Sequence, residues 1–395
     1  MTTTARGTTV RALGAVTVGT LLANLLAYVV QVPASRVLGP DGFGQFSVLN
    51  AAMLVLSVPA LAVQAVVARE VVKGTSRRRL WRLIGLVGVV VAVGSAVGVV
   101  VMMPLAHTSW ATTLAALAGA APLAVIAGGQ GFLQGEGRFG LLGGVLAGVG
   151  VAKSAPIIAA IAFGAGPTGA LAAGTIGSVV AAIVVAVLAA DSRADRAGSG
   201  SGAARIGMGD VLSASSVQFV MIVAVSVDLL LSRSVLSADD AGVYALGAVA
   251  TKAAFWLPQA IGVVVFPRLA DPVRSAVALR RAVTVLAGIG CAVTVAAVAC
   301  GPLVPAVISD DYRPVAGWMW LFALTGSLLA VLQVMLLAAI ARNSARGAAP
   351  AFAVLIVEVV LIVSVADSVL GLAAIAAACA SAAVIGTWAW MRAVG

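Results

Sequence analysis

Three ionisable side chains lie in the middle of long apolar segments, where a charge is costly. Lys153 and Lys252 each lie near the centre of such a segment, and Glu358 is the only acid at a comparable position. A lysine at the centre of a membrane costs about 3 kcal/mol unless it faces water or a partner. We therefore expect both ammonium groups to face a polar cavity and to bind an anion as point charges. In the alternative, the lysine stems snorkel to the interface, which from this depth requires about 15 Å.

Two carboxylates are candidates for binding and releasing a proton or metal cation. Glu358 is embedded deeply enough for such coupling, although it could equally be a counter-ion for a lysine or stay protonated and inert. Asp228 lies nearer the end of its segment, so an ion pair or helix cap is favoured there over coupling. We assign both residues as candidate ion-coupling groups.

Further polar side chains could form the rest of a binding site. Arg36 and Arg233 occupy similar places at the ends of two apolar segments, where they could bind an anion at an outer gate or simply anchor the segments at the interface. Amides inside the segments could bond sugar hydroxyls or could join helices to one another. The amide candidates are Asn24, Gln31, Gln64, Gln218 and Gln259.

A weak internal repeat relates the two halves of the chain. Val37, Leu38, Asp41 and Gly44 recur 198 positions later as Val235, Leu236, Asp239 and Gly242, and Phe46 corresponds to Tyr244. Each copy lies in a short polar turn between two apolar segments. A duplicated membrane half is typical of secondary transporters, whose binding sites lie between the repeats.

The composition identifies a membrane protein. Hydrophobic residues make up 62% of the 395 residues and charged residues only 10%, too few to solvate a soluble protein of this length. Although the net charge is +10, the basic residues lie in short loops and form no nucleic-acid groove. The only histidine, His107, is in a connecting turn, and the three cysteines lie in apolar segments, so we expect no metal site, disulfide or cofactor.

The apolar segments predict twelve membrane-spanning helices in two groups of six. Each is long enough to cross about 30 Å of hydrocarbon. The predicted lobes are 1–190 and 209–395, joined by a cytoplasmic linker at 191–208 that is rich in Gly, Ser and Ala. The predicted spans are 13–35, 45–68, 80–103, 110–133, 140–163, 168–190, 209–232, 242–266, 278–300, 315–341, 349–366 and 368–391.

The distribution of basic residues predicts the orientation. With the N-terminus inside, 19 of the 24 Lys and Arg residues fall in inner loops, three in outer loops and two within spans. This is a strong positive-inside pattern, so we expect both termini to be cytoplasmic. We expect the protein to lie in the plasma (inner) membrane. Six spans per half is an even number, so the halves are expected to be parallel repeats.

Small residues and prolines inside the spans predict how the helices pack. We expect the pairs Gly94/Gly98 and Gly144/Gly148 to mark close helix contacts. The prolines are expected to kink the helices or act as hinges. They are Pro33, Pro59, Pro156 and Pro258.

The turn between the first two spans resembles that of polysaccharide flippases in the multidrug/oligosaccharidyl-lipid/polysaccharide exporter superfamily. Those proteins commonly carry L-G-P-x-x-F-G-x-[FY] there. The matching residues in this chain are Leu38, Gly39, Pro40, Phe43, Gly44 and Phe46. Two weaker similarities are GFLQGEGRF at 131–139 and the pair DLLL at 228–231 and AGVY at 241–244.

The resemblance implies an all-α protein whose two six-helix bundles surround a central V-shaped cavity, walled by the first, second, seventh and eighth helices. It also implies alternating access that moves a polyprenyl-diphosphate-linked oligosaccharide from the cytoplasmic to the outer leaflet, for cell-surface polysaccharide assembly. The implied partners are this lipid-linked glycan, the bilayer and other surface-polysaccharide assembly proteins. No enzyme activity is expected.

Other functions are compatible with some of these features. A cation-coupled drug or small-solute antiporter of the same superfamily would favour embedded acids, whereas the embedded lysines indicate an anionic substrate. A membrane-bound glycan polymerase needs active loops outside the bilayer, and the loops here are short. A scaffold without transport activity would not need lysines in the middle of the membrane.

Overall fold

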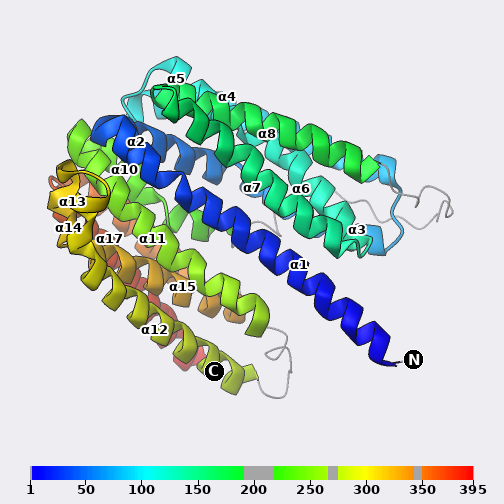
Figure 1. Ribbon diagram of the computed structural model, residues 1–395. Helices are drawn as coiled ribbons and strands as arrows, with labels where there is room; N and C mark the ends of the chain where they lie inside the picture. The colour runs from blue at the N-terminus through cyan, green and yellow to red at the C-terminus, as the bar shows by residue number, and fades with distance from the viewer. Residues whose placement is uncertain (1, 191–217, 266–274, 342–348, 395) are drawn as a thin grey trace. The chain divides into compact units, whose positions relative to one another are not determined.

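The structure is a computed structural model of the chain. It describes the backbone over residues 2–190, 218–265, 275–341 and 349–394, and side chains over 14–190, 218–257, 280–338 and 349–392. All regular elements in this described part are helices (Figure 1). The predicted linker at 191–208 lies outside it.

The helices follow one another along the chain with short connections. In the first half they are α1 (Thr2–Val29), α2 (Gln31–Leu56), α3 (Val58–Val72), α4 (Arg77–Leu105), α5 (Trp110–Leu117), α6 (Ala120–Gly135), α7 (Phe139–Ala162) and α8 (Pro167–Ala190). In the second half they are α10 (Val227–Val235), α11 (Ala238–Val265), α12 (Ser275–Cys300), α13 (Val304–Val307), α14 (Arg313–Ala316), α15 (Met319–Ala341), α16 (Ala349–Val365) and α17 (Val369–Val394).

The helices coincide with the predicted spans. Within the described residues, nine helical stretches are long and apolar enough to cross a membrane, and the first of them, Gly14–Val72, contains two predicted spans. Ala349–Val365 is a shorter apolar helix at the eleventh predicted span, and α11 occupies the eighth. The seventh span is described from Gln218.

Several spans are interrupted rather than continuous. Gly39 has φ 68° and ψ 177°, which breaks α2 at the predicted turn between the first two spans. A second break at Ser57 divides the second span, and Pro59 lies at the start of α3, where it loses no helical hydrogen bond. Pro156, in contrast, is accommodated inside α7, where its ring lies beside Gly177 of α8. The fourth span is divided into α5 and α6.

The described chain forms two compact units. The first comprises Met1–Val37, Leu49–Pro104 and Thr108–Phe219, and the second comprises Leu38–Val48, Leu105–His107 and Val220–Gly395. Two short segments from the first half of the sequence, 38–48 and 105–107, therefore belong to the second unit.

Close glycine contacts hold the first unit together. A Cβ on Gly143 would lie 2.3 Å from the carbonyl oxygen of Ala15, and one on Gly150 would lie 2.7 Å from the Cα of Ala23, so α1 and α7 pack backbone to backbone. The prediction that Gly144 and Gly148 mark a close helix contact was wrong, because no described atom lies within 4 Å of a Cβ at either position. The contact uses a different face of α7.

The glycines of α4 pack against side chains. A Cβ on Gly98 would lie 3.0 Å from Leu56 and 3.2 Å from Leu117, whereas one on Gly94 would have only ordinary van der Waals contact. Gly98 thus marks a close contact, as predicted, and Gly94 contributes little.

The second unit is assembled around α15. A Cβ on Gly326 of α15 would lie 2.0 Å from the carbonyl oxygen of Thr251 in α11, and the ring of Phe322 lies against Gly247. Phe322 also stacks edge-on with Tyr244, at 5.1 Å between ring centroids. These contacts fix α11, which carries Tyr244 and Lys252, against the core of the unit.

Candidate functional site

A buried acidic group lies where the seventh span is interrupted. The helix breaks at Val225 and Ser226, and α10 begins at Val227, so Asp228 occupies its first turn. A carboxylate at this position is stabilised by the helix dipole and by free backbone N–H groups. The amide of Leu229 donates to Asp228 Oδ1 at 2.7 Å, and Tyr244 Oη donates to Oδ2 at 2.6 Å. Asp228 is therefore held in one orientation, 3% exposed.

Glu358 brings a second buried carboxylate to this group from α16. It is 7% exposed, and it interacts electrostatically with Asp228. No hydrogen bond links Glu358 to any residue in the described part of the chain. Lys252 of α11 is partly exposed and also interacts electrostatically with Asp228. The second unit thus brings together three of the predicted site residues.

Asp228, Glu358 and Lys252 remain candidates for cation coupling. Two carboxylates in a dry environment repel each other unless one is protonated or a cation lies near. Lys252 supplies one positive charge, and a proton or a metal ion could supply another. The hydroxyl of Ser226, at the helix break two residues before Asp228, is fully buried and lacks a hydrogen-bond partner among the described residues.

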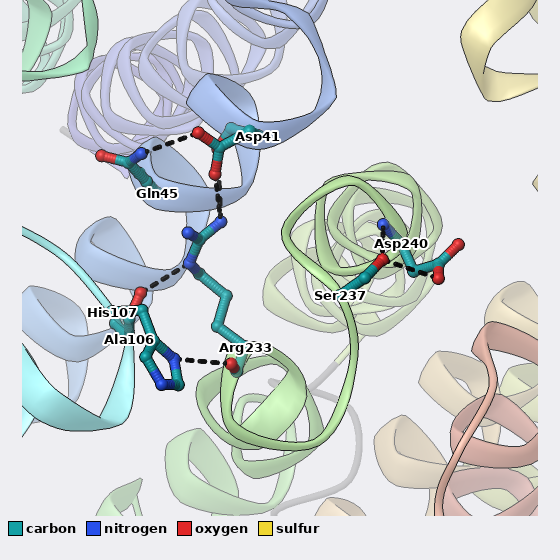
Figure 2. A network of polar contacts seen from close by, with 7 residues as sticks. All are labelled: Asp41, Gln45, Ala106, His107, Arg233, Ser237 and Asp240. Atoms are coloured by element: carbon teal, nitrogen blue, oxygen red, sulfur yellow. Dashed lines mark hydrogen bonds and ion pairs between the residues drawn. The ribbon is translucent and has the colours of Figure 1, made fainter.

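Arg233, at the other end of α10, forms a separate network (Figure 2). Its side chain is 4% exposed, and Nη1 lies 2.8 Å from Asp41 Oδ1. Its Nε donates to the carbonyl oxygen of Ala106 at 2.5 Å, and His107 Nδ1 donates to the Arg233 carbonyl oxygen at 2.9 Å. One arginine therefore joins α10 to the segments 38–48 and 105–107, both of which belong to the second unit.

The same region shows the two copies of the repeated turn in contact. Gly44 lies against Gly242, with 3.2 Å between a Cβ built on Gly44 and the backbone of Gly242. A Cβ on Gly242 would lie only 1.8 Å from the carbonyl oxygen of Pro40. Gly44 and Gly242 are equivalent positions of the repeat. Equivalent positions of the repeat therefore pack against each other within the second unit.

The predicted residues of the first unit are more dispersed. Lys153 is partly buried in α7 and makes no hydrogen bond or ion pair with a described residue. Asn24 is exposed on α1, and Gln31 Nε2 donates to the carbonyl oxygen of Ala27 at 3.4 Å. Gln64 Nε2 donates to Gln134 Oε1 at 3.2 Å, so this amide joins α3 to α6.

The two arginines predicted at the span ends, Arg36 and Arg233, have different environments. Arg36 is exposed in the first unit, whereas Arg233 is buried in the second, so their equivalence in sequence is not matched by equal environments. The side chain of Gln259 lies outside the described side chains. The binding roles of all these residues stay predictions.

Sequence reasoning missed several members of the two networks. Tyr244 was noted in the repeat and in the AGVY motif, but its contact with Asp228 of the DLLL motif was not predicted. Ser226 could not be found, because no Gly or Pro adjoins it to indicate a helix break. In the described part of the chain, no group of three or more His, Cys, Asp or Glu residues could hold a metal ion.

Comparisons with known proteins identify the fold. No family model matches the sequence, and no curated protein matches it. The chain is similar to a structure of the lipid II flippase MurJ in an inward closed conformation, with TM-score 0.68 and 11% identity over 95% of this chain and 86% of MurJ. It is also similar to an inward-facing multidrug resistance transporter of the MATE family, with TM-score 0.69 and 14% identity over 94% of both chains.

A third similar structure is a MOP-superfamily transporter from Pyrococcus furiosus, with TM-score 0.54, 15% identity, and coverage of 97% of this chain and 94% of the other. All three identities are low, so these similarities establish architecture alone. The predicted fold class, an all-α polytopic membrane protein with twelve spans in two bundles, is confirmed. The chain has the fold of the multidrug/oligosaccharidyl-lipid/polysaccharide exporters.

Proposed function

We propose that the chain is a transporter that carries a polyprenyl-diphosphate-linked oligosaccharide from the cytoplasmic to the outer leaflet by alternating access. One observation carries the proposal. This chain, whose fold is similar to that of a lipid II flippase, has a lysine, Lys153, in the apolar helix α7, and no described acid pairs with it. An unpaired cation at that depth is retained at a cost, and an anionic headgroup is a ligand that would offset it.

In this proposal the two lysines have different roles. Lys153 provides a point charge for the diphosphate, because none of the described acids interacts with it. Lys252 shares its charge with Asp228, so its affinity for phosphate depends on the state of that carboxylate. The amides of Asn24, Gln31, Gln64 and Gln259 remain candidates for bonding sugar hydroxyls. The lobes 1–190 and 209–395 would move against each other during the cycle.

The buried carboxylates Asp228 and Glu358 would couple the cycle to a cation. When a proton or metal ion binds, the repulsion between the acids is relieved and Lys252 is released from its counter-ion role. When the cation leaves, Lys252 is drawn to Asp228 and its hold on phosphate weakens. Binding of cation and anionic substrate would thus be positively linked within one unit.

The test is the fate of lipid-linked glycan in cells that lack the gene. An added lectin or glycosidase that cannot cross the membrane reports precursor in the outer leaflet. We expect inaccessible precursor to accumulate, and the unaltered gene to restore access. Lys153→Met should fail to restore it, and Lys153→Arg, which keeps the charge, should restore it in part. Lys73→Met is the matched control, because Lys73 is an exposed lysine in a turn.

Normal surface precursor in the deletion strain would overturn the proposal, provided that no second flippase is present. Equal loss of function in Lys153→Met and Lys73→Met would also contradict it, because the effect would then not depend on the embedded charge.

A second candidate is a cation-coupled antiporter of cationic drugs or small solutes. The buried pair Asp228 and Glu358 favours it, since acids in a binding site select positively charged substrates. The discriminating experiment is efflux of a fluorescent cationic dye from cells that express the protein. Efflux abolished by Glu358→Gln but unaffected by Lys153→Met would favour the antiporter.

A further inference from the structure

Helix α4 has a buried side and an exposed side along its whole length. The buried side chains are Leu80, Leu83, Ile84, Val87, Val91, Ser95 and Met102. The exposed large apolar side chains are Leu86, Val89, Val90, Val93, Val97, Val100 and Val101. Their spacing of three or four residues places the exposed set on one face of the helix.

Exposed arginines precede the apolar face at the N-terminal end of α4. Arg78 and Arg82 precede Leu86 at intervals of four residues, so they lie on the same face, and both are exposed. Arg77 points to the opposite side, where Nη1 lies 2.7 Å from Glu136 Oε1 and the guanidinium lies 4.5 Å from the centroid of the Phe132 ring. The first turn of α4 contains no acid. Neighbouring arginines in one turn therefore have separate roles.

The carboxylates of Glu70 and Glu136, in the same unit as α4, already have cationic partners. Glu70, whose side chain is 7% exposed, accepts hydrogen bonds from Lys73 Nζ at 2.8 Å and from Thr75 Oγ1 at 2.9 Å. Glu136, whose side chain is 10% exposed, pairs with Arg77 and Arg138.

No acid in the described part of the chain pairs with the exposed arginines of α4. The surface is thus cationic and uncompensated at the end of an apolar stripe.

We propose that the exposed face of α4 binds an anionic phospholipid of the predicted cytoplasmic leaflet. The lipid phosphate contacts Arg78 and Arg82, and an acyl chain lies along the stripe that begins at Leu86. From Arg82 to Val101 the helix rises about 28 Å, which exceeds the roughly 15 Å of one leaflet, so the stripe accommodates a full acyl chain. Charge complementarity selects an anionic headgroup over a zwitterionic one. This site is independent of the cargo proposed above.

The test is native mass spectrometry of the purified full chain, titrated with phosphatidylglycerol or with phosphatidylcholine of the same acyl chains. We expect one phosphatidylglycerol to bind more tightly than the rest. In Arg78→Gln/Arg82→Gln, that binding should weaken about thirtyfold, the effect of two surface charges. The Arg78→Lys/Arg82→Lys variant should retain most of it and shows that the fold tolerates substitution there.

The matched control is Arg69→Gln/Arg313→Gln, which removes two exposed arginines that already lie beside carboxylates, Glu70 and Asp310. It changes net charge equally and should bind phosphatidylglycerol as the unaltered chain does. Equal weakening in both double variants would overturn the proposal in favour of a general charge effect.

Two further probes identify the occupant. Inorganic phosphate should not displace the lipid, because it cannot use the apolar stripe. Displacement by phosphate alone would show an anion site without a lipid. A polyprenyl phosphate that displaced phosphatidylglycerol at lower concentration would overturn the phospholipid assignment and identify a recruiting surface for the carried lipid.

Discussion

At the residue scale, the hydrogen bond from Tyr244 Oη to Asp228 Oδ2 is a fully buried polar contact of the second unit. A hydrogen bond to a buried carboxyl contributes about 2 kcal/mol, and its loss leaves an acceptor without a donor. We expect Tyr244→Phe to lower the free energy of unfolding by about this amount, measured by thermal unfolding of the purified protein in detergent.

Tyr28→Phe is the matched control for this prediction, because Tyr28 makes no hydrogen bond to a described residue and should change stability by less than about 0.5 kcal/mol. Equal stability of the two variants would show that the contact between Tyr244 and Asp228 contributes nothing.

Gly242 provides a second residue-scale prediction. An added methyl group would meet the Pro40 carbonyl oxygen at 1.8 Å, and backbone cannot move aside as a flexible side chain does. We expect Gly242→Ala to destabilise the protein by about 3 kcal/mol or to abolish its accumulation in the membrane. Gly148→Ala should be neutral or slightly stabilising, because that position is open and alanine favours a helix. A stable Gly242→Ala variant would contradict the described contact.

At the element scale, Arg233 holds the segments 38–48 and 105–107 against α10. Its loss would leave the carbonyl of Ala106 and the carboxylate of Asp41 without their shared donor. We expect Arg233→Gln to speed amide hydrogen exchange in 38–48 and 105–107 about tenfold, which corresponds to about 1.4 kcal/mol of local opening. Arg78→Gln, which changes an exposed arginine of α4, should leave exchange in both segments unchanged. Unaltered exchange in Arg233→Gln would show that other contacts hold the segments 38–48 and 105–107 in place.

The elements also show where sequence reasoning succeeds and fails. Apolar segments bounded by polar turns predicted the long helices in the described part of the chain, because each helix must be apolar where it meets lipid. The break at Gly39 was predicted from a turn motif, but the break at Ser226 was not, because tertiary packing determines it. The choice of Gly144 and Gly148 was in error because sequence spacing gives a face of a helix but not the neighbour it meets. The ion pair of Asp41 with Arg233 joins residues 192 positions apart, and only the folded chain brings them together.

At the scale of the whole molecule, the distribution of basic residues predicts the orientation. We expect Ser76→Cys to lie inside the cell and Ser368→Cys outside, both exposed and each in a background with Cys291, Cys300 and Cys379 replaced by alanine. A membrane-impermeant maleimide applied to intact cells should label Ser368→Cys and reach Ser76→Cys only after permeabilisation. Labelling of both residues in intact cells, or the reverse pattern, would contradict the twelve-span topology.

The site could be predicted only in outline. Embedded lysines and acids are visible in the sequence because charge is rare in apolar spans, and three of them come together in the second unit. Their hydrogen-bond partners could not be predicted. Hydroxyl groups and backbone amides occur throughout the sequence, and only the packing of the helices determines which of them contact the charged groups.

The most direct measurement is translocation by the purified chain in proteoliposomes. A fluorescent polyprenyl-diphosphate sugar is placed in both leaflets, and a quencher that cannot cross the membrane bleaches the outer one. We expect vesicles that contain the protein to lose the protected half of the fluorescence, and vesicles with Lys153→Met to retain it. Protected fluorescence that persists with the folded, unaltered protein, with or without a proton or sodium gradient, would contradict lipid-linked glycan transport.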